Sequence, residues 1–217
     1  MIIIKNTRAV IFDMDGTLIN SISYHKEAWI TFLKKYNIYL EPNQFNAQNH
    51  GTINEMIVRF FGDRVDLNKI KDLGQEKERI YRELYKNDIK EIDGLTNFLI
   101  ELKSKNIKIG LATNCDTPNI DFVLESLNIK KYFDVIIGGH EVVYGKPNPE
   151  IYIAILNRLG IMNHEAIVIE DSEGGILSAL KAGINVVGIT SSHNADELRK
   201  YGCYEIIDDF KHFEIIK

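Results

Sequence analysis

Short β-branched apolar runs recur along most of the chain, and each is flanked by polar residues or by glycine. Such runs are typical of strands that are buried on both faces of a sheet. The stretches between them have helical length, and apolar residues such as Leu95, Phe98 and Leu102 share one helix face. Strand alternating with helix predicts an α/β fold, a parallel sheet with helices on both faces. The expected strands are residues 9–12, 107–112, 135–137, 166–169 and 185–189.

This alternation is interrupted after the first expected strand. From about Ser21 to Asn87 the apolar spacing is helical, and no convincing strand is present. Gly62 is placed to end the second of the helices expected there. The expected helices cover residues 24–32, 53–60 and about 67–85. The pattern therefore predicts a helical domain, residues 19–91, inserted into a core made of residues 1–18 and 92–217.

Composition narrows the partners that this chain can have. The 217 residues carry a formal net charge of −5 and form no basic stretch, which argues against a nucleic-acid partner. Lys5 and Arg8 interrupt the apolar start well before a signal sequence or a membrane span could form. The two cysteines, Cys115 and Cys203, have neither a metal-binding spacing nor a disulfide pattern. We therefore expect a cytoplasmic monomer without membrane association.

Two carboxylates, Asp13 and Asp15, directly follow the first expected strand. Residues two positions apart at a strand end point to the same side, so these like charges repel unless something offsets them. A hard divalent cation with oxygen ligands would do so, and Gly16 lets the chain turn sharply afterwards. A simple Asp-Gly turn would explain this motif on its own. A calcium loop fits poorly, because its sixth position would be Leu18 instead of glycine.

Polar side chains also follow the other expected strands. Thr113 and Asn114 end the second, Lys146 lies between the third and its helix, and Glu170 and Asp171 end the fourth. Each could be a helix cap or a solvated side chain when taken alone. Together they mark the C-terminal edge of a parallel sheet, where ligands bind in open α/β folds. Convergence of acids, a hydroxyl and an ammonium at that edge predicts a binding site.

Two nucleotide-binding loops are excluded by spacing. The stretch from Gly139 to Lys146 resembles a P-loop, but five residues separate its glycines where four are required. Pro147 also replaces the Ser or Thr that would hold Mg²⁺. No G-x-G-x-x-G sequence follows the first expected strand, so the dinucleotide fingerprint is missing.

Taken in order, these motifs resemble those of the haloacid dehalogenase-like superfamily, specifically its β-phosphoglucomutase-like branch with a helical cap. The resemblance extends over nearly the whole chain. It implies a Rossmann-like core with the cap inserted after the first motif. It also implies a Mg²⁺-dependent enzyme that passes a phosphoryl group through an aspartyl-phosphate. The reaction expected first is that of a phosphoric monoester hydrolase.

The resemblance implies a role for each core residue. Asp13 would be the nucleophile, and Asp15 would protonate the leaving oxygen and then activate water or a sugar hydroxyl. Thr113 would donate its hydroxyl to a phosphoryl oxygen, and Lys146 would offset negative charge. The expected metal-binding residues are Asp13, Asp15 through its backbone carbonyl, Asp171, and Glu170 in an outer shell or through water.

The resemblance extends to the cap. His25 falls where the mutases have a histidine facing the site, and Lys77 falls near the lysine that couples to it. Gly51 and Thr52 match the substrate-specificity loop of the cap. These four residues and Asn114 are therefore expected to contact the substrate.

One departure from the family pattern guides the choice of reaction. Asn54 stands where β-phosphoglucomutase has an arginine that grips the second phosphate, and losing that bidentate cation weakens the case for a bisphosphate intermediate. We therefore expect a phosphatase of small phosphorylated metabolites, sugar phosphates in particular. The alternative is a hexose-phosphate mutase. A remoter alternative is a phospho-acceptor signalling domain, although such domains are about half this length and lack the cap.

Overall fold

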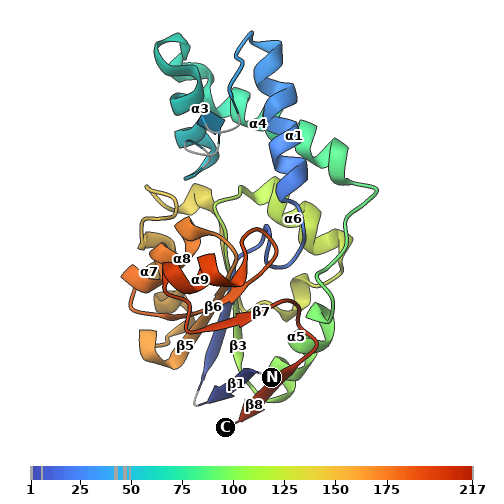
Figure 1. Cartoon of the computed structure of the whole chain (residues 1–217), viewed down its shortest axis with the longest axis vertical. Coiled ribbons are helices and arrows are strands. Elements are labelled where there is room, and N and C mark those ends of the chain that lie inside the picture. Colours follow the sequence, from blue (N-terminus) through green and yellow to red (C-terminus); the bar gives the residue numbers. More distant parts are fainter. Residues whose placement is uncertain (1, 6, 42–43, 46–47, 49, 217) are drawn as a thin grey trace.

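The computed structural model describes residues 2–5, 7–41, 44–45, 48 and 50–216. The chain folds into an α/β part and a smaller helical part that stands on one end of it (Figure 1). The helical part follows the second strand of the chain, so it is an insertion into the α/β part. The inserted arrangement predicted from the sequence is therefore confirmed.

A six-stranded parallel sheet forms the centre of the α/β part, in the order β4-β3-β2-β5-β6-β7. The chain adds strands on one side of β2 and then returns to add the rest on the other side. Such a reversal opens a crevice at the C-terminal ends of the strands. The strands are β2 (Ala9–Phe12), β3 (Lys108–Ala112), β4 (Val135–Ile137), β5 (Ala166–Glu170), β6 (Asn185–Ile189) and β7 (Glu205–Ile207).

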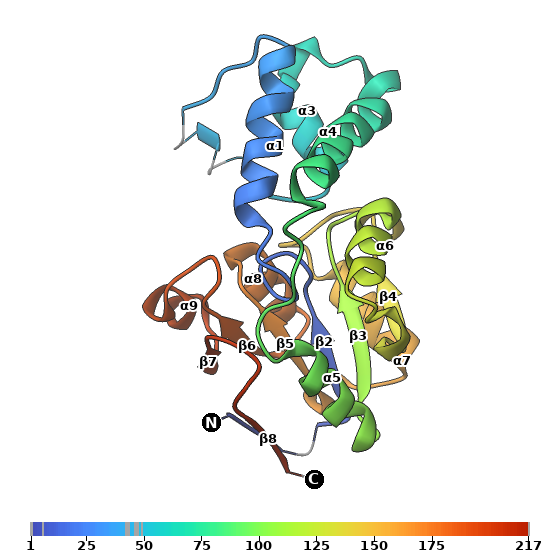
Figure 2. The same cartoon turned by 90° about the vertical axis from the view of Figure 1, so that its right-hand side faces the viewer.

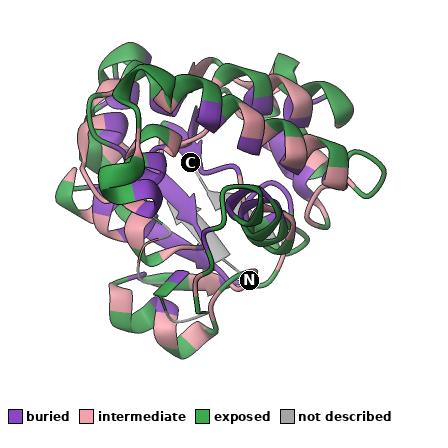
Figure 3. Ribbon diagram, turned by 90° about the horizontal axis from the view of Figure 1, so that it is seen from above, coloured by how far each residue is buried: buried purple, intermediate pink, exposed green. Residues whose placement is uncertain are grey.

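Helices cover both faces of this sheet because its strands alternate between two apolar clusters. Val10 and Phe12 pack with α5 and α6, whereas Ala9 and Ile11 pack with α7, α8 and α9. The helices are α5 (Leu95–Ser104), α6 (Thr117–Ser126), α7 (Glu150–Leu159), α8 (Glu173–Lys181) and α9 (Ala195–Tyr201). The central strands are buried on both sides, as Figure 3 shows from above. The predicted fold class is therefore confirmed.

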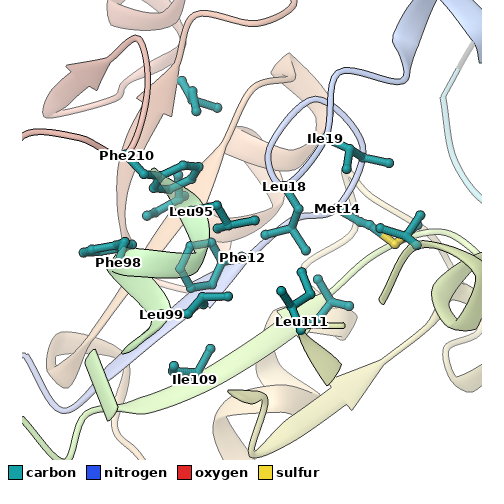
Figure 4. Packing of buried hydrophobic residues seen from close by; sticks show 14 of the residues in the cluster. Phe12, Met14, Leu18, Ile19, Leu95, Phe98, Leu99, Ile109, Leu111 and Phe210 are labelled. Carbon is teal, nitrogen blue, oxygen red and sulfur yellow. The ribbon is translucent and has the colours of Figure 1, made fainter. Parts of the chain in front are cut away.

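Phe12, the residue before the acidic motif, is locked into the core. Its ring meets Phe98 edge-to-face with centroids 6.0 Å apart, and it meets Phe210 at 5.9 Å (Figure 4). Leu18 and Ile19 belong to the same buried cluster just beyond the motif. Burial on both sides of the turn fixes the backbone that carries Asp13 and Asp15.

The helical part has an apolar core of its own, in which Trp29, Phe32 and Phe60 pack together. Its helices are α1 (Ile22–Lys35), α3 (Ile53–Phe61) and α4 (Ile70–Tyr85). Short 3₁₀ turns occur here and in the α/β part: η1 (Gly62–Arg64), η2 (Leu67–Lys69), η3 (Lys130–Tyr132), η4 (Gly139–Glu141) and η5 (Asn163–Glu165).

The two segments that join the parts lie side by side (Figure 2). Ile19 and Glu91 form an antiparallel bridge, and the Ile92 amide donates to the Leu18 carbonyl at 2.8 Å. The predicted boundaries, 18/19 and 91/92, fall in these paired segments and stay a prediction. None of the helices in the described part of the chain has the length and apolar character that a bilayer crossing requires.

Three strands have no counterpart among the sequence predictions. β7 extends the main sheet by three residues. β1 (Ile2–Lys5) pairs in parallel with β8 (Phe213–Ile216) to form a separate two-stranded sheet near the termini.

Candidate active site

A cavity of about 240 Å³ lies between the C-terminal ends of the strands and the helical part. Its lining includes nine of the residues predicted from the sequence: Asp13, Asp15, His25, Gly51, Lys77, Thr113, Asn114, Lys146 and Asp171. Thr52 and Glu170 are buried beside it without lining it. Residues from both parts of the chain thus meet at one site.

Lys146 joins the acidic residues at the floor of the cavity. Its Nζ donates to Asp13 Oδ1 at 2.6 Å, to Glu170 Oε1 at 2.6 Å and to the Ala112 carbonyl at 2.8 Å. Burial, reinforced by Glu170, raises the pKa of Asp13, and Lys146 opposes that rise. Burial also disfavours the Lys146 ammonium, but Asp13 and Glu170 outweigh it and raise the pKa of Lys146. A buried cation with such partners holds Asp13 in one orientation.

Glu170 organises the loop after β5. Besides Lys146, it accepts hydrogen bonds from the Tyr152 hydroxyl at 3.0 Å, from the Asp171 amide at 3.1 Å and from the Ser172 hydroxyl at 3.1 Å. A Cβ on Gly175 would lie 1.7 Å from Glu170 Oε1, so only glycine fits there. Glu170 is fully buried and amply bonded, which suits a positioning role.

Among the buried acids of the described residues, Asp171 has a carboxylate oxygen that lacks a hydrogen-bond partner. It is buried, and its Oδ2 accepts no hydrogen bond from any described residue. Burial, together with the charge of Glu170, raises the pKa of Asp171 to about 8. Gly16 has φ +81°, and a Cβ there would lie 2.0 Å from Asp171 Oδ2. The main chain at Gly16 therefore lies directly against the Asp171 oxygen that has no hydrogen-bond partner.

These acids fit a divalent cation. Asp13, Glu170 and Asp171 each offer an oxygen, and these oxygens lie within 4.8 Å of one another. Oxygen ligands are what Mg²⁺ prefers, and a cation would satisfy the orphaned Asp171 oxygen and offset the repulsion between the acids. The donor set that the sequence predicts is therefore chemically suited to Mg²⁺.

Asp15 is surrounded by donors from both parts of the chain. Its Oδ1 accepts from Ser21 Oγ at 2.5 Å, from His25 Nε2 at 3.1 Å and from Tyr81 Oη at 3.4 Å. Its Oδ2 accepts from the Cys115 thiol at 3.0 Å. Burial opposes ionisation, but His25 and the hydrogen bonds from Cys115 and Ser21 outweigh it and hold the pKa of Asp15 well below its usual range. In this arrangement Asp15 is a carboxylate that can accept a proton.

Lys77 fixes the histidine that contacts Asp15. Its Nζ lies 2.8 Å from His25 Nδ1 and 3.0 Å from Glu78 Oε1. Because an ammonium only donates, Nδ1 must accept, and the ring proton lies on Nε2, which donates to Asp15. The imidazole stacks on Tyr81 with ring centroids 3.7 Å apart. Lys77 thus acts on Asp15 through His25.

The remaining predicted residues have hydrogen-bond partners within the protein, and one of these bonds joins the two parts. Thr113 Oγ1 accepts from the Cys115 amide at 3.2 Å. Asn114 Nδ2 donates to the Gly51 carbonyl at 3.1 Å, and its Oδ1 accepts from the Lys146 amide at 3.0 Å. The hydroxyl of Thr52 accepts from the Glu55 amide and caps α3. In this arrangement Asn114 and Thr52 both have structural partners.

The site geometry agrees with comparisons to known proteins. A model of haloacid dehalogenase-like hydrolases matches residues 10–189. A phosphorylated carbohydrates phosphatase of Thermotoga maritima is 36% identical over 194 residues, which cover 86% of this chain and 87% of that protein. The chain belongs to the haloacid dehalogenase-like hydrolase family. It is therefore an enzyme, and the signalling-domain alternative is set aside.

Solved structures show the same hydrolase fold with its helical cap. A family hydrolase from Entamoeba histolytica has a TM-score of 0.83 and 33% identity, and the match covers 94% of both chains. A β-phosphoglucomutase from Clostridium difficile has a TM-score of 0.81 and 28% identity, with 94% of this chain and 92% of that chain covered. The resemblance stated from the sequence motifs is confirmed.

Several site residues of this hydrolase were missed in the sequence. Cys115 and Asp116 line the cavity, and they directly follow Thr113 and Asn114. They would have been found if the search for polar residues after each expected strand had been extended by two positions. Glu78 also lines the cavity, and its Oε2 accepts from Asn119 of α6 at 2.6 Å. No local pattern signals that contact, because it depends on how the cap sits on the core.

Proposed function

We propose that this hydrolase is a Mg²⁺-dependent phosphatase of small phosphorylated carbohydrates that works through an aspartyl-phosphate on Asp13. The observation that carries the proposal is the position of Asp13, bound to Lys146 on the cavity floor beside Asp15 and the unsatisfied Asp171. A relative named as a phosphatase of phosphorylated carbohydrates supports the substrate class, and relatives named as phosphoglycolate phosphatases support the phosphatase reaction alone. We also propose residues 19–91 as the cap that encloses the substrate.

Asp13 would supply the nucleophile. One of its oxygens attacks phosphorus, and the bond from phosphorus to the ester oxygen of the substrate breaks. Lys146 holds the carboxylate in place and offsets charge on it and on the phosphoryl group, with Thr113 as a hydrogen-bond donor. Asp13, Asp171 and the Asp15 carbonyl would hold Mg²⁺, which supplies further charge neutralisation when bound. Glu170 would keep Lys146 and the Asp171 loop in position.

Asp15 would move the protons. In its protonated form it would donate to the departing ester oxygen, and as a carboxylate it would take a proton from the water that attacks the aspartyl-phosphate. Its ring of donors from Ser21, His25 and Cys115 favours the carboxylate form, which suits the second step.

Phosphate release from a panel of phosphorylated carbohydrates tests this proposal. We expect turnover with Mg²⁺, loss of turnover in chelator and inhibition by Ca²⁺, whose looser geometry would let Asp13 bind through both oxygens. Asp13→Asn keeps the shape of the side chain and should lower turnover by roughly 10⁴-fold or more. Full activity in chelator, or in Asp13→Asn, would refute the mechanism.

Hydrolysis is favoured over the mutase reaction by the lining of the cavity. Asn54 is exposed and does not line the cavity, and no arginine appears among the described lining residues. A second phosphate would therefore find no bidentate partner there. The test supplies β-glucose 1-phosphate with a trace of glucose 1,6-bisphosphate. We expect free phosphate to form first, and faster formation of glucose 6-phosphate would overturn the assignment.

A further inference from the structure

Charge is distributed unevenly over the walls of the cavity. The floor of the cavity, at the strand ends, carries Lys146 together with Asp13, Asp15 and Asp171. The wall away from this floor carries few charged groups among the described residues. Among the described lining residues beyond the floor, the lysines and acids are Lys77, Glu78 and Asp116, and the histidines are His25 and His50. We call Lys77, Glu78, Asp116 and His50 the distal wall, because the non-reacting end of a bound phosphate ester would face it.

Lys77 is not free to bind an anion. It is 1% exposed, its ammonium already donates to His25 and Glu78, and it lies 5.0 Å from the centroid of the Trp29 ring. Glu78 matches its charge and is held by Asn119 as well. Burial, helped by Arg59 and opposed by Glu55, lowers the pKa of His50, which favours its uncharged form. Neither cationic candidate of the distal wall therefore offers an unmatched positive charge.

Asp116 leaves the distal wall negative. It occupies the N-cap position of α6, yet its side chain makes no capping hydrogen bond, and it lines the cavity instead. It is half-buried, and burial raises the pKa of its carboxyl; the charge of Glu78 adds to that rise, whereas His140 and Lys71 oppose it. His140 and Lys71 are both exposed to solvent, which screens their effect. Since Lys77 and Glu78 compensate each other, the charge of Asp116 dominates the wall.

We propose that Asp116 makes this hydrolase select phosphomonoesters whose non-reacting end is an uncharged polyol, and reject those that carry a second anion. The inference rests on the proposed phosphatase function and names its substrate class. A hydroxyl can donate to a carboxylate, whereas a substrate carboxylate or second phosphate has no proton to give and meets a like charge. Such repulsion in a partly enclosed site decides between substrates of equal size.

Two size-matched pairs of substrates test the inference. The first is glucose 6-phosphate against 6-phosphogluconate, and the second is glycerol 3-phosphate against 3-phosphoglycerate. We expect kcat/KM to favour the neutral member of each pair by at least about tenfold, since like-charge contacts cost several kcal/mol. Each compound is also measured as a competitive inhibitor of p-nitrophenyl phosphate hydrolysis, so that a poorly turned-over compound still reports its binding.

Asp116→Asn is the decisive variant, because asparagine has the same shape and also suits an N-cap position. In this variant the ratio of kcat/KM between the neutral and the anionic member of each pair should fall close to one, because kcat/KM for the anionic member rises. Asp121→Asn is the matched control. It removes the same charge from α6 at a partly exposed position, where Asp121 pairs with Lys130 at 2.7 Å, and it should leave the preference unchanged.

The outcomes separate the inference from the function on which it rests. If no phosphate ester, including p-nitrophenyl phosphate, is hydrolysed, the proposed function fails. If esters are hydrolysed but the anionic members are turned over and bound as well as the neutral ones, the inference is wrong and the function stands. The inference is equally wrong if Asp116→Asn leaves an observed preference intact, or if Asp121→Asn abolishes it.

Discussion

Two buried lysines face the cavity, one from the core and one from the cap, and they are held in different ways. Lys146 is bound by Asp13, Glu170 and the Ala112 carbonyl, all of them in the core. Lys77 is bound by Glu78 and His25 of the cap, and only His25 reaches across to a core acid. The core lysine therefore keeps its partners wherever the cap stands.

The cap lysine affects the chemistry only while the cap rests on the core. Its influence on Asp15 passes through the His25 ring, whose contact with Asp15 is 3.1 Å long. Movement of α1 away from the strand ends would break that contact and leave Lys77 with Glu78. We infer that the core carries the reaction, while the cap adjusts Asp15 and selects the substrate. The following variants test this division, from the largest expected effect to the smallest.

Lys146→Met should have the largest effect. It leaves Asp13 and Glu170 buried without their cation, and breaking a buried pair in this way costs about 3–5 kcal/mol of stability. Turnover should fall by roughly 10³-fold or more on every substrate, because the nucleophile loses its orientation and its charge partner. Chemical denaturation and steady-state kinetics measure the two losses. A stable variant with substrate-dependent losses would show that Lys146 belongs to substrate selection.

Lys77→Met should have an intermediate and substrate-dependent effect. His25 loses the donor that fixes its tautomer, so kcat/KM on sugar phosphates should fall roughly 10- to 100-fold, part of what proton transfer contributes. Turnover of p-nitrophenyl phosphate should fall by less than about threefold, since nitrophenolate leaves without a proton. Both rates are measured on one preparation whose folding is checked by circular dichroism. Equal losses on both substrates would contradict the proposed division between core and cap.

Most of the core could be predicted from the sequence because its pattern is local. Strand runs such as 9–12 and 166–169 are apolar and bounded by polar residues, and parallel strands bring their ends together without further information. β7 was missed because Glu205–Ile207 is too short to show a period. β1 and β8 were missed because pairing between opposite ends of the chain leaves no local signal.

The candidate site divides in the same way. Asp13, Thr113, Lys146 and Asp171 were found from their places after strands, and the structure brings all four to one cavity. The cap residues could be named only through the family resemblance. Contacts such as Asn119 with Glu78 were not predictable, because helix periodicity gives the buried face of each helix but not the placement of one domain on another.

Asn119→Ala tests that unpredicted contact and should have a smaller effect. Asn119 of α6 accepts from Arg82 and donates to Glu78 of α4, each at 2.6 Å. Removing it should favour the open cap and raise KM by about threefold to tenfold, with kcat nearly unchanged, as expected for the loss of one or two hydrogen bonds. Glu83→Gln is the control, because it removes an exposed charge from α4, the helix that carries Arg82 and Glu78. An unchanged KM would mean that this contact does not hold the cap closed.

Thr52→Ala should have the smallest effect, and it decides between two roles for a residue that the sequence placed in the substrate loop. Its hydroxyl accepts from the Glu55 amide at the start of α3, and the Glu55 carboxylate accepts from the Thr52 amide at 2.6 Å. If capping is its role, the variant loses roughly 0.5–1 kcal/mol of stability, and KM changes by less than about twofold. Thr52→Ser retains the hydroxyl and should restore the loss. A KM raised by about tenfold or more at unchanged stability would instead place the hydroxyl on the substrate. The same outcome would add Thr52 to the residues that face the substrate. Gly51 and Thr52 already pack against Gly145, in the core loop that carries Lys146, so Thr52 lies close to the catalytic residues.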